Sequence, residues 1–413
     1  MYQILSNLLW KIIKPICINI VRKKGYPEDA IKCKCGEVLE EGFSKKDNVI
    51  MFHGVSVGEV IALENLIKTA KAEFKNSKIV MTTGTYTGQE IAKKKLGDFT
   101  DLVTYFPADF PCVINKFLDK INPSVVFIAE TEIWPNFAIE CKKRGIKLFI
   151  INGRISDSTY KSYKLFRWVF KYFLNLYTGI FTQSIDDNNK FLSLGANSNT
   201  TIVMNNLKFD IKRPENLEFY KNNERVLLAG STHSGEDEIV LNVFKKLKKK
   251  HSDLKLILAP RHLTRVEDVK KIIIDYGFSY SLRSNNINSV ENCDVLLLDT
   301  LGELGKMYAF SDISFIGGSF NKTGGHNPLE SIVFNKPVIS GPSIHNFKDI
   351  YAIIKKAEAG YIVNNETEFY NIADKMLSEE VFYNETIKKC EKVFTEQQGA
   401  LDFVINTLKS LQS

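Results

Sequence analysis

The stretch SDISFIGGSFNKTGGHNPLE, residues 311–330, decides the fold, because it joins an apolar run, a glycine-rich loop and the start of a helix. Asn is a favoured N-cap residue, Pro suits the first helical position, and a Glu three residues after the cap can bond back to it. We therefore expect a helix that opens at HNPLE, with Asn327 and Glu330 as a capping box. Glycines let backbone N–H groups approach a ligand, and a helix N-terminus favours negative charge. Both a capped strand–helix loop and a phosphate or ribose site fit these residues.

Similar apolar runs, each followed by a longer amphipathic stretch, recur from residue 49 onward. Strands are predicted at residues 48–52, 78–83, 102–106, 125–130 and 147–151, and again at 225–231, 254–260, 294–300, 312–318 and 336–341. Alternating strands and helices form parallel sheets, and 413 residues exceed one ordinary core. The predicted fold class is α/β, with two open parallel-sheet domains. The predicted segments are 1–24 (a helix), 45–207 (first domain), 208–222 (polar linker), 223–390 (second domain) and 391–413 (a last helix).

Positive charge is concentrated at the N-terminus. The net charge is +7, and residues 1–24 contribute five cations and no acid, which leaves 7 − 5 = +2 for the rest. This distribution excludes a generally basic protein, so we expect no nucleic-acid partner. A composition of 44% hydrophobic and 25% charged residues is that of a globular protein.

Residues 1–24 have the pattern of an amphipathic helix. Apolar side chains recur every fourth residue at Ile4, Leu8, Ile12, Ile16 and Ile20, while Asn7, Lys11 and Lys14 fall on the opposite face. Two lysines and a proline interrupt the run, which favours a helix on a membrane surface over one that spans the membrane. No small-residue cleavage site follows, which disfavours a removed signal peptide. We expect a retained membrane-surface anchor; the alternative is a helix that packs on the protein.

The seven cysteines show no framework spacing. Cys33 and Cys35 flank a single residue in CKC, which matches neither a zinc knuckle nor a CxxC redox pair. We expect reduced thiols in a cytosolic setting and assign no role to this motif.

Open parallel sheets bind ligands beyond the carboxyl ends of their strands, so the loops after the predicted strands are the candidate sites. Four of the six histidines lie in these loops, His53, His233, His262 and His326, which suggests a site. Four pairs in the loops have the spacing of a capping box: Ser56 with Glu59, Thr87 with Glu90, Thr300 with Glu303, and Asn327 with Glu330. Taken singly, each of these glutamates is more often a cap than a catalyst.

The residue types in these loops favour a sugar nucleotide. Arg261, Lys322 and the helix starts after Thr232 and Gly325 would suit phosphate and ribose. In the first half, a carboxylate such as Glu59 in a helix-opening loop could take a proton from an attacking hydroxyl. No HExxH, DxD or Cys cluster is present, which disfavours a metal site, and the absence of GxGxxG and GK[ST] disfavours dehydrogenases and kinases.

Residues 160–177, YKSYKLFRWVFKYFLNLY, hold eight aromatic residues and four cations without an acid. One interpretation is a long helix whose aromatic face belongs to the core. The other is a surface leading to a lipid-borne, anionic acceptor, since Tyr, Trp, Lys and Arg favour the membrane interface.

Nine motifs, in this order, carry a resemblance to a known family: HGVSVGE (53–59), TTGTYTG (82–88), ETEIWPN (130–136), NGRIS (152–156), NLKFD (206–210), GSTHSGE (230–236), PRH (260–262), DTLGEL (299–304) and GGSFNKTGGHNPLE (317–330). Together they resemble the 3-deoxy-D-manno-octulosonic acid (Kdo) transferases of lipopolysaccharide synthesis, over about residues 49–345. The resemblance implies a B-type glycosyltransferase fold, with an acceptor-binding and a nucleotide-sugar-binding Rossmann-like domain facing a cleft. The last helix would cross back to the first domain.

The resemblance also implies an activity. It implies inverting transfer of Kdo from CMP-Kdo to a lipid A precursor (lipid IVA), at the cytoplasmic face of the inner membrane. No metal and no cofactor would be required.

The resemblance implies roles for residues of this sequence. Glu59 would be the catalytic base. The donor-binding residues would be Ser231, Thr232, Arg261, His262, Gly302, Glu303, Gly317, Gly318, Ser319, His326, Asn327 and Glu330, with Arg261 on the leaving phosphate and Asn327 and Glu330 on the ribose. Acceptor-side candidates are His53, Ser56, Thr85, Glu130, Glu132 and Arg154. The chain departs from the family pattern at Gly54-Val55, where two small residues are usual, and at Asn205, where a glycine is expected.

Two alternatives remain open from the sequence. One is another two-domain glycosyltransferase or a nucleotide-sugar epimerase of similar fold. The other is a non-catalytic sugar-nucleotide-binding membrane protein. The number of Kdo units transferred and the oligomeric state are not indicated by any motif.

Overall fold

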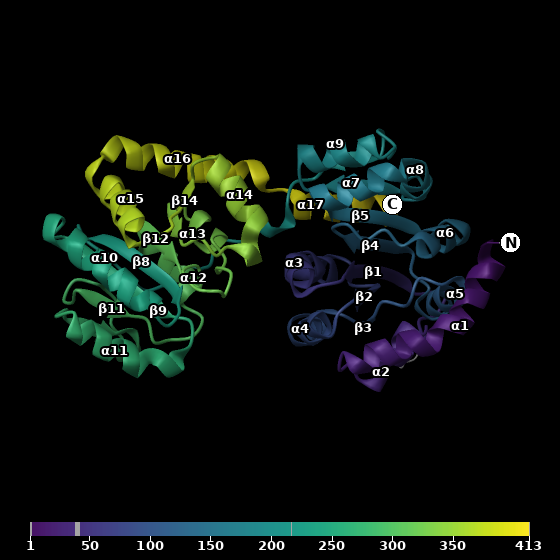
Figure 1. Ribbon diagram of the computed structural model, residues 1–413, viewed down its shortest axis with the longest axis horizontal. Coiled ribbons are helices and arrows are strands. Elements are labelled where there is room, and N and C mark those ends of the chain that lie inside the picture. The colour runs from purple at the N-terminus through teal and green to yellow at the C-terminus, as the bar shows by residue number, and fades with distance from the viewer. Residues whose placement is uncertain (1, 38–41, 216, 413) are drawn as a thin grey trace. The chain divides into compact units, whose positions relative to one another are not determined.

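The computed structural model describes residues 2–37, 42–215 and 217–412. Met1 and Ser413, at the ends of the predicted first and last segments, and residue 216 of the predicted linker lie outside the described residues. The chain divides into two compact units (Figure 1): Met1–Asp210 with Gln397–Ser413, and Ile211–Glu396. Each unit is built on one parallel sheet with helices on both of its faces.

The first unit contains a seven-stranded sheet in the order β3-β2-β1-β4-β5-β6-β7. Its strands are β1 (Asn48–Gly54), β2 (Ser77–Thr83), β3 (Leu102–Tyr105), β4 (Val125–Ala129), β5 (Lys147–Gly153), β6 (Gly179–Thr182) and β7 (Thr201–Val203). Its helices are α1 (Tyr2–Lys23), α2 (Glu28–Lys34), α3 (Val57–Glu73), α4 (Tyr86–Leu96), α5 (Pro111–Ile121), α6 (Pro135–Arg144), α7 (Asp157–Leu165), α8 (Arg167–Leu174), α9 (Ile185–Ser193) and α17 (Ala400–Gln412). The order reverses direction at β1 and β4, which is the switch point where such sheets bind ligands.

Strand β1 shows how the sequence builds both cores of this unit. Successive side chains of a strand point to opposite faces of the sheet. Val49 and Met51 accordingly pack into one hydrophobic cluster, and Ile50 and Phe52 into the other. Since both faces are covered by helices, the strand reads as a continuous apolar run rather than an alternating one.

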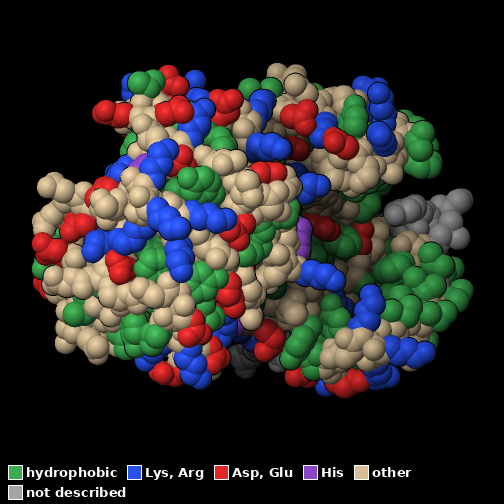
Figure 2. All heavy atoms as spheres, turned by 60° about the vertical axis from the view of Figure 1, so that its left-hand side comes forward, with side chains coloured by type: hydrophobic (Ala, Val, Ile, Leu, Met, Phe, Trp, Pro, Cys, Tyr) green, Lys and Arg blue, Asp and Glu red, His purple; other side chains and the backbone are tan. Residues whose placement is uncertain are grey.

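Helix α1 packs on the unit through the side opposite its isoleucine stripe. Trp10 is buried and stacks on Phe110 with ring centroids 4.7 Å apart, and Asn7 Oδ1 accepts a hydrogen bond from the backbone N–H of Cys112. The apolar stripe Leu8, Leu9, Ile12, Ile16 and Ile20 is 49–71% exposed. Green side chains gather over α1 at the right-hand edge of Figure 2. Among the described residues, no helix combines the length and the hydropathy needed to cross a membrane.

The second unit repeats the architecture with the order β10-β11-β9-β8-β12-β13-β14. Its strands are β8 (Arg225–Thr232), β9 (Leu254–Pro260), β10 (Tyr280–Leu282), β11 (Val295–Leu297), β12 (Ile313–Ile316), β13 (Val338–Ser340) and β14 (Gly360–Ile362). Its helices are α10 (Glu236–Lys250), α11 (Val266–Asp275), α12 (Leu304–Met307), α13 (Leu329–Ile332), α14 (Lys348–Lys356), α15 (Glu366–Ser378) and α16 (Glu380–Gln397). The predicted α/β class with two Rossmann-like parallel sheets is therefore confirmed.

The end of the chain is not the single helix predicted for residues 391–413. Helix α16 ends at Gln397 and α17 begins at Ala400, because Gly399 adopts a φ of +98° that breaks the helix. Helix α17 packs in the same core cluster as α3 of the first unit.

The motif NLKFD fastens α17 to the first unit. The carboxylate of Asp210 accepts hydrogen bonds from the backbone N–H groups of Gly399 and Leu401, at 2.7 and 2.6 Å, and so caps α17. Asn205 stands where a glycine is expected and has a φ of +69°, a conformation that Asn tolerates better than most residues. Its side-chain amide donates to the carbonyl of Gln398.

One of the two interpretations of residues 160–177 was wrong, and four short strands were missed. The aromatic segment 160–177 is not one long helix, because α7 and α8 meet at Phe166, and it leaves Leu165, Phe166, Trp168 and Tyr172 57–79% exposed. Strands β6, β7, β10 and β14 were not predicted, since each has only three or four residues and too short an apolar run to stand out. All seven cysteines are free thiols.

Candidate active site

Glu59 lies in the first turn of α3, directly after β1, and the local sequence holds it there. Ser56 is the N-cap: its Oγ accepts the Glu59 N–H at 3.4 Å and donates to Glu59 Oε1 at 2.8 Å. Glu59 Oε2 accepts the backbone N–H of Val55 at 2.7 Å. The predicted capping box therefore exists, with Val55 in place of Ser56 as the backbone donor.

The surroundings of Glu59 favour proton transfer near neutral pH. Its side chain is only 8% exposed, and burial, reinforced by the nearby Glu130 carboxylate, raises its pKa to about 7. The hydrogen bonds from Val55 and Ser56 oppose that shift. A carboxylate whose pKa lies close to ambient pH is well suited to act as a general base.

The loop after β4 places two more carboxylates near Glu59. Glu130 adopts a φ of +60°, and its backbone N–H donates to Ile151 of the neighbouring strand β5. Burial and the charge of Glu130 raise the pKa of Glu132. The backbone carbonyl of Arg154, after β5, accepts a hydrogen bond from Thr131 Oγ1 and so joins the two loops. The structure thus brings Glu59, Glu130 and Glu132 together at one edge of the first sheet.

The other acceptor-side candidates serve the framework. His53 is 0% exposed, its Nδ1 lies 3.2 Å from the carbonyl of Thr82 and 3.0 Å from its Oγ1, and burial lowers its pKa to about 3. Its ring packs on Phe106 and Trp134, so it holds these side chains rather than presenting itself at the surface. Thr85 caps α4 by accepting the Gly88 N–H at 3.1 Å, so the predicted Thr87–Glu90 box is wrong.

In the second unit three histidines come together beyond the ends of β8, β9 and β12. His233 Nε2 and His326 Nε2 are 2.9 Å apart, and the ring of His262 lies edge-on to His233 at 5.8 Å between centroids. Burial lowers the pKa of His233, and burial together with Arg261 lowers that of His326 to about 4. Because two neutral imidazoles can bond only if one donates and the other accepts, the pair shares one proton.

Glu236 holds the glycine-rich loop, a role that the sequence analysis missed. The residue is 1% exposed, and its two oxygens accept four backbone N–H groups: Gly318 at 2.7 Å, Ser319 and Phe320 at 2.8 Å, and His233 at 2.9 Å. The repeated Gly-Glu at the end of HGVSVGE and GSTHSGE was the available signal. Ser319 itself is buried and bonds the Ile316 carbonyl and the Gly341 N–H.

The two glycines that open the loop are required by close packing. A Cβ on Gly317 would lie 2.3 Å from the carbonyl oxygen of Ser231. Gly318 has a φ of +69°, and a Cβ there would lie 3.0 Å from the His326 ring. The loop is therefore shaped around the histidine cluster.

The helix after this loop begins later than predicted. Helix α13 starts at Leu329 with Pro328 as N-cap, and Asn327 Oδ1 accepts the Leu329 N–H at 3.1 Å. Glu330 therefore does not close a capping box with Asn327, because Asn327 is not the N-cap and Glu330 is the second residue of the helix, not the third. Burial raises the pKa of the Glu330 carboxyl group, and the positive charge of Arg261 opposes that shift, which places the two side chains near each other.

The remaining donor-side candidates have structural partners. Glu303 pairs with Arg283 at 2.9 Å and accepts a bond from Thr300 Oγ1, beside Gly302 with its φ of +83°. Thr232 is buried, and its Oγ1 donates to Asp237 at 2.6 Å. Ser231 adopts a φ of +56° at the end of β8. The side chains that converge are thus His233, His262, His326, Arg261 and Glu330.

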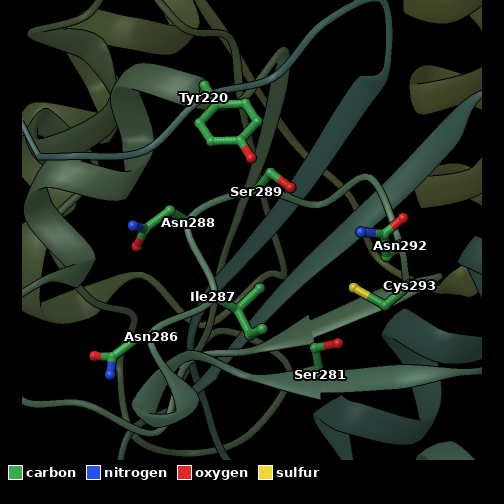
Figure 3. Close-up of a pocket in the computed structure, with 8 residues that line it drawn as sticks. All are labelled: Tyr220, Ser281, Asn286, Ile287, Asn288, Ser289, Asn292 and Cys293. Atoms are coloured by element: carbon green, nitrogen blue, oxygen red, sulfur yellow. The ribbon is translucent and has the colours of Figure 1, made fainter.

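Two further observations describe the surroundings of these sites. Among the described residues, no group of three or more His, Cys, Asp or Glu side chains is arranged to hold a metal ion. A cavity of about 280 Å³ in the second unit (Figure 3) contains none of the predicted site residues. It is lined by Tyr220, Ser281, Asn286, Ile287, Asn288, Ser289, Asn292 and Cys293.

Two Rossmann-like parallel sheets in one chain, each with polar residues gathered at its ligand-binding edge, define the class of B-type glycosyltransferases and related nucleotide-sugar enzymes. The fold is shared with the crystal structure of UDP-GlcNAc 2-epimerase from Neisseria meningitidis bound to UDP-GlcNAc. That likeness has a TM-score of 0.56 and 16% identity, and covers 88% of this chain and 100% of that one.

Sequence comparison narrows the class to a family. Residues 31–211 match the model of the 3-deoxy-D-manno-octulosonic-acid transferases. The 3-deoxy-D-manno-octulosonic acid transferase of Haemophilus influenzae is 32% identical over 87% of this chain and 86% of its own length. A bifunctional glycosyltransferase/methyltransferase of Fusobacterium nucleatum is 34% identical over 90% of this chain, which spans 59% of that relative. The chain belongs to the 3-deoxy-D-manno-octulosonic acid transferase family of glycosyltransferases.

Proposed function

We propose that this protein transfers Kdo from CMP-Kdo to a lipid A precursor (lipid IVA), with inversion at the anomeric carbon. The observation that carries the proposal is the state of Glu59: a buried carboxyl group with a pKa of about 7, at the switch point of the first sheet. Membership of the Kdo transferase family supports this choice of donor and acceptor.

In the proposed mechanism the first unit activates the acceptor. The carboxylate of Glu59 takes the proton of the acceptor hydroxyl as its oxygen attacks the anomeric carbon of Kdo. The new glycosidic C–O bond forms as the bond between Kdo and the CMP phosphate breaks, and the electron pair leaves with CMP. Val55 N–H and Ser56 Oγ hold the carboxylate in position during the transfer.

The second unit stabilises the leaving nucleotide in this proposal. Arg261 and the imidazole N–H groups of the histidine cluster would meet the charge that develops on the CMP phosphate. Glu330, near Arg261, would accept hydrogen bonds from the ribose hydroxyl groups. Glu236 keeps the loop of Gly317 and Gly318 in the conformation that this contact requires. No metal or cofactor is included, because these cationic and N–H groups would neutralise the phosphate.

We also place the reaction at the cytoplasmic face of the inner membrane. Helices α1 and α8 lie toward the same end of the first unit (Figure 1), and each has exposed apolar side chains: the stripe of α1, and Trp168 and Tyr172 of α8. Beside the stripe, a cavity of about 460 Å³ between α1 and α5 is bordered by Lys11, Lys14 and Lys116. Apolar side chains next to lysines are typical of helices that lie at an anionic membrane surface.

A transfer assay tests the proposed function. The purified protein is incubated with CMP-Kdo generated in situ and the lipid A precursor in detergent with EDTA, and products are read by mass spectrometry. A product heavier by one or more Kdo units supports the donor, the acceptor and metal independence, and counts the additions. If no product forms while CMP still protects the protein from heat, the assigned acceptor is wrong.

Membrane attachment has a separate test. Replacing Ile12 and Ile16 with Ser should reduce binding to vesicles that contain anionic lipid, because two apolar side chains of the stripe no longer enter the bilayer. Exposed Ile274 on α11 of the second unit provides the control, since Ile274→Ser should leave binding unchanged. Equal binding by the stripe variant and the control would remove α1 from this role.

A further inference from the structure

The CKC motif, to which the sequence analysis assigns no role, positions a cation at the active-site edge of the first sheet. Lys34 is the last residue of α2, a helix that packs beside β3 (Figure 1). Its Nζ donates to the backbone carbonyl of Gly84, just after β2, at 3.0 Å. The rings of Tyr26 and Tyr105 each lie 5.6 Å from Nζ, and Cys33 and Cys35 on either side are buried.

This cation has no anionic partner within the described residues. The Gly84 carbonyl is the acceptor for one of its three N–H groups, and no carboxylate in the described part of the chain lies within ion-pair distance. Burial lowers the pKa of Lys34. A partly buried ammonium group without a counter-ion is costly, and two uncommitted N–H donors leave it ready to bind an anion.

Lys34 is connected to Glu59 by a short series of contacts. Gly84, which accepts its hydrogen bond, donates its own N–H to the Val55 carbonyl at 3.2 Å. Val55 in turn donates its N–H to the Glu59 carboxylate. Lys34 also contributes to the lowered pKa of His53, the residue next to that loop. An anion held at Lys34 would therefore lie one loop away from the catalytic base.

The charges around Glu59 make this edge of the sheet asymmetric. Glu130 and Glu132 follow β4 on one side of β1, and Lys34 lies over the ends of β2 and β3 on the other. The carboxylates repel an anionic group, whereas the ammonium group attracts it. A negatively charged acceptor can therefore approach Glu59 in only one favourable orientation, with its charge toward α2.

We propose that Lys34 is an acceptor-binding residue whose ammonium group takes a phosphate group of the lipid-borne acceptor and thereby orients the attacking hydroxyl toward Glu59. Lys binds phosphate as a compact point charge, which suits a site closed on two sides by aromatic rings. This inference rests on the proposed acceptor, and it adds the group that recognises the acceptor's charge.

The experiment compares two acceptors: the lipid A precursor and the same lipid after enzymatic removal of its sugar phosphates. With the native protein, we expect kcat/KM for the phosphorylated acceptor to exceed that for the dephosphorylated one at least tenfold. Lys34→Met should lose that preference, mainly through a higher KM, and should leave transfer to the dephosphorylated acceptor unchanged. Lys34→Arg should restore most of the preference because it retains the positive charge.

Two matched variants separate binding from a structural role. Lys32→Met removes an exposed lysine of the same helix and should behave like the native protein. Lys34→Gln removes the charge but retains a donor for Gly84, and it decides the outcome if Lys34→Met does not fold. Equal losses with both acceptors would mean that Lys34 only supports α2, and no loss with either would also overturn the proposal.

A binding measurement distinguishes failure of this inference from failure of the proposed function. Without donor, the phosphorylated acceptor should raise the unfolding temperature of the native protein more than that of Lys34→Gln. If the native protein transfers Kdo and the two proteins are protected equally, Lys34 does not bind the phosphate. If the native protein binds neither acceptor and transfers to neither, the proposed acceptor is wrong and this inference is lost with it.

Discussion

The first strand–helix loops of the two units have nearly the same local sequence pattern and different roles. HGVSVGE (53–59) follows β1 and GSTHSGE (230–236) follows β8, and each ends with Gly-Glu at the start of a helix. Both glutamates are buried, at 8% and 1% exposure. Among the described residues, the Glu59 side chain is hydrogen-bonded only by its own loop, through Val55 and Ser56. Glu236 bonds its own loop at His233 and three consecutive N–H groups of the loop after β12.

This difference separates a reactive carboxylate from a structural one. Four N–H donors satisfy the oxygens of Glu236, which therefore holds two loops together. Glu59 is buried, has fewer hydrogen-bond donors and has two acidic neighbours, so its pKa is raised to about 7. The Gly-Glu dipeptide occupies the same place in both units. Its glutamate is a candidate base in the first unit and a structural residue in the second, because different residues pack around it.

The largest expected effect is on catalysis at Glu59. Glu59→Gln should lower kcat at least about 100-fold, because a general base is lost, while CMP affinity stays unchanged. The amide can still accept the Val55 N–H, so the fold should be retained. Steady-state kinetics with calorimetric CMP binding measures both quantities, and Glu90→Gln on the exposed face of α4 is the control. Near-normal turnover in Glu59→Gln would give the base role to another residue.

Glu236 should respond in the opposite way. In Glu236→Gln an NH₂ group faces two of the four backbone N–H groups, and each buried donor left unpaired costs about 1–3 kcal/mol. We expect the free energy of unfolding to fall by about 2–4 kcal/mol and CMP binding to weaken with it. Urea unfolding and CMP titration measure these changes. Full stability with lost turnover would instead make Glu236 a second catalytic carboxylate.

The pH dependence sharpens the comparison further. Since the pKa of Glu59 is about 7, its basic form is depleted as pH falls, and kcat/KM should drop about tenfold between pH 8 and pH 6. The value of kcat/KM falls as the pH is lowered because only the ionised carboxylate accepts a proton. Rates measured across this range test the sign, and in Glu59→Gln the residual activity should lose this dependence. A native profile that is flat from pH 6 to pH 8 would contradict the elevated pKa.

The smallest expected effect is at Glu330. Glu330→Gln should weaken CMP binding about fivefold, because a neutral amide replaces a charged acceptor for the ribose hydroxyl groups at a loss of about 1 kcal/mol. Thermal protection by CMP is a convenient measurement, with Glu366→Gln, on α15 of the same unit, as the control. Unchanged CMP affinity would mean that Glu330 does not bind the ribose and has only a structural role in the first turn of α13.

Local sequence patterns correctly predicted those hydrogen bonds whose partners are close together in the sequence. The Ser56–Glu59 cap was correct because all of its partners lie within four residues along the chain. The box at Asn327 was wrong, since Pro328 rather than Asn327 is the N-cap and the helix begins only at Leu329. The role of Glu236 could not be predicted from neighbouring residues, because three of its four partners are 82–84 residues away along the chain.

The sequence by itself determined the two α/β units, the family and the loops in which the chemistry lies. Strands buried on both faces must be apolar throughout, and helix starts need particular caps, so both leave a local record. Only the tertiary structure decided which face of α1 is exposed and which glutamate has its pKa raised to about 7. It also decided that Lys34 of CKC donates to Gly84 in the loop that contacts Val55, with no carboxylate partner among the described residues. Burial and charge pairing depend on residues brought together across a sheet, and no spacing along the chain encodes them.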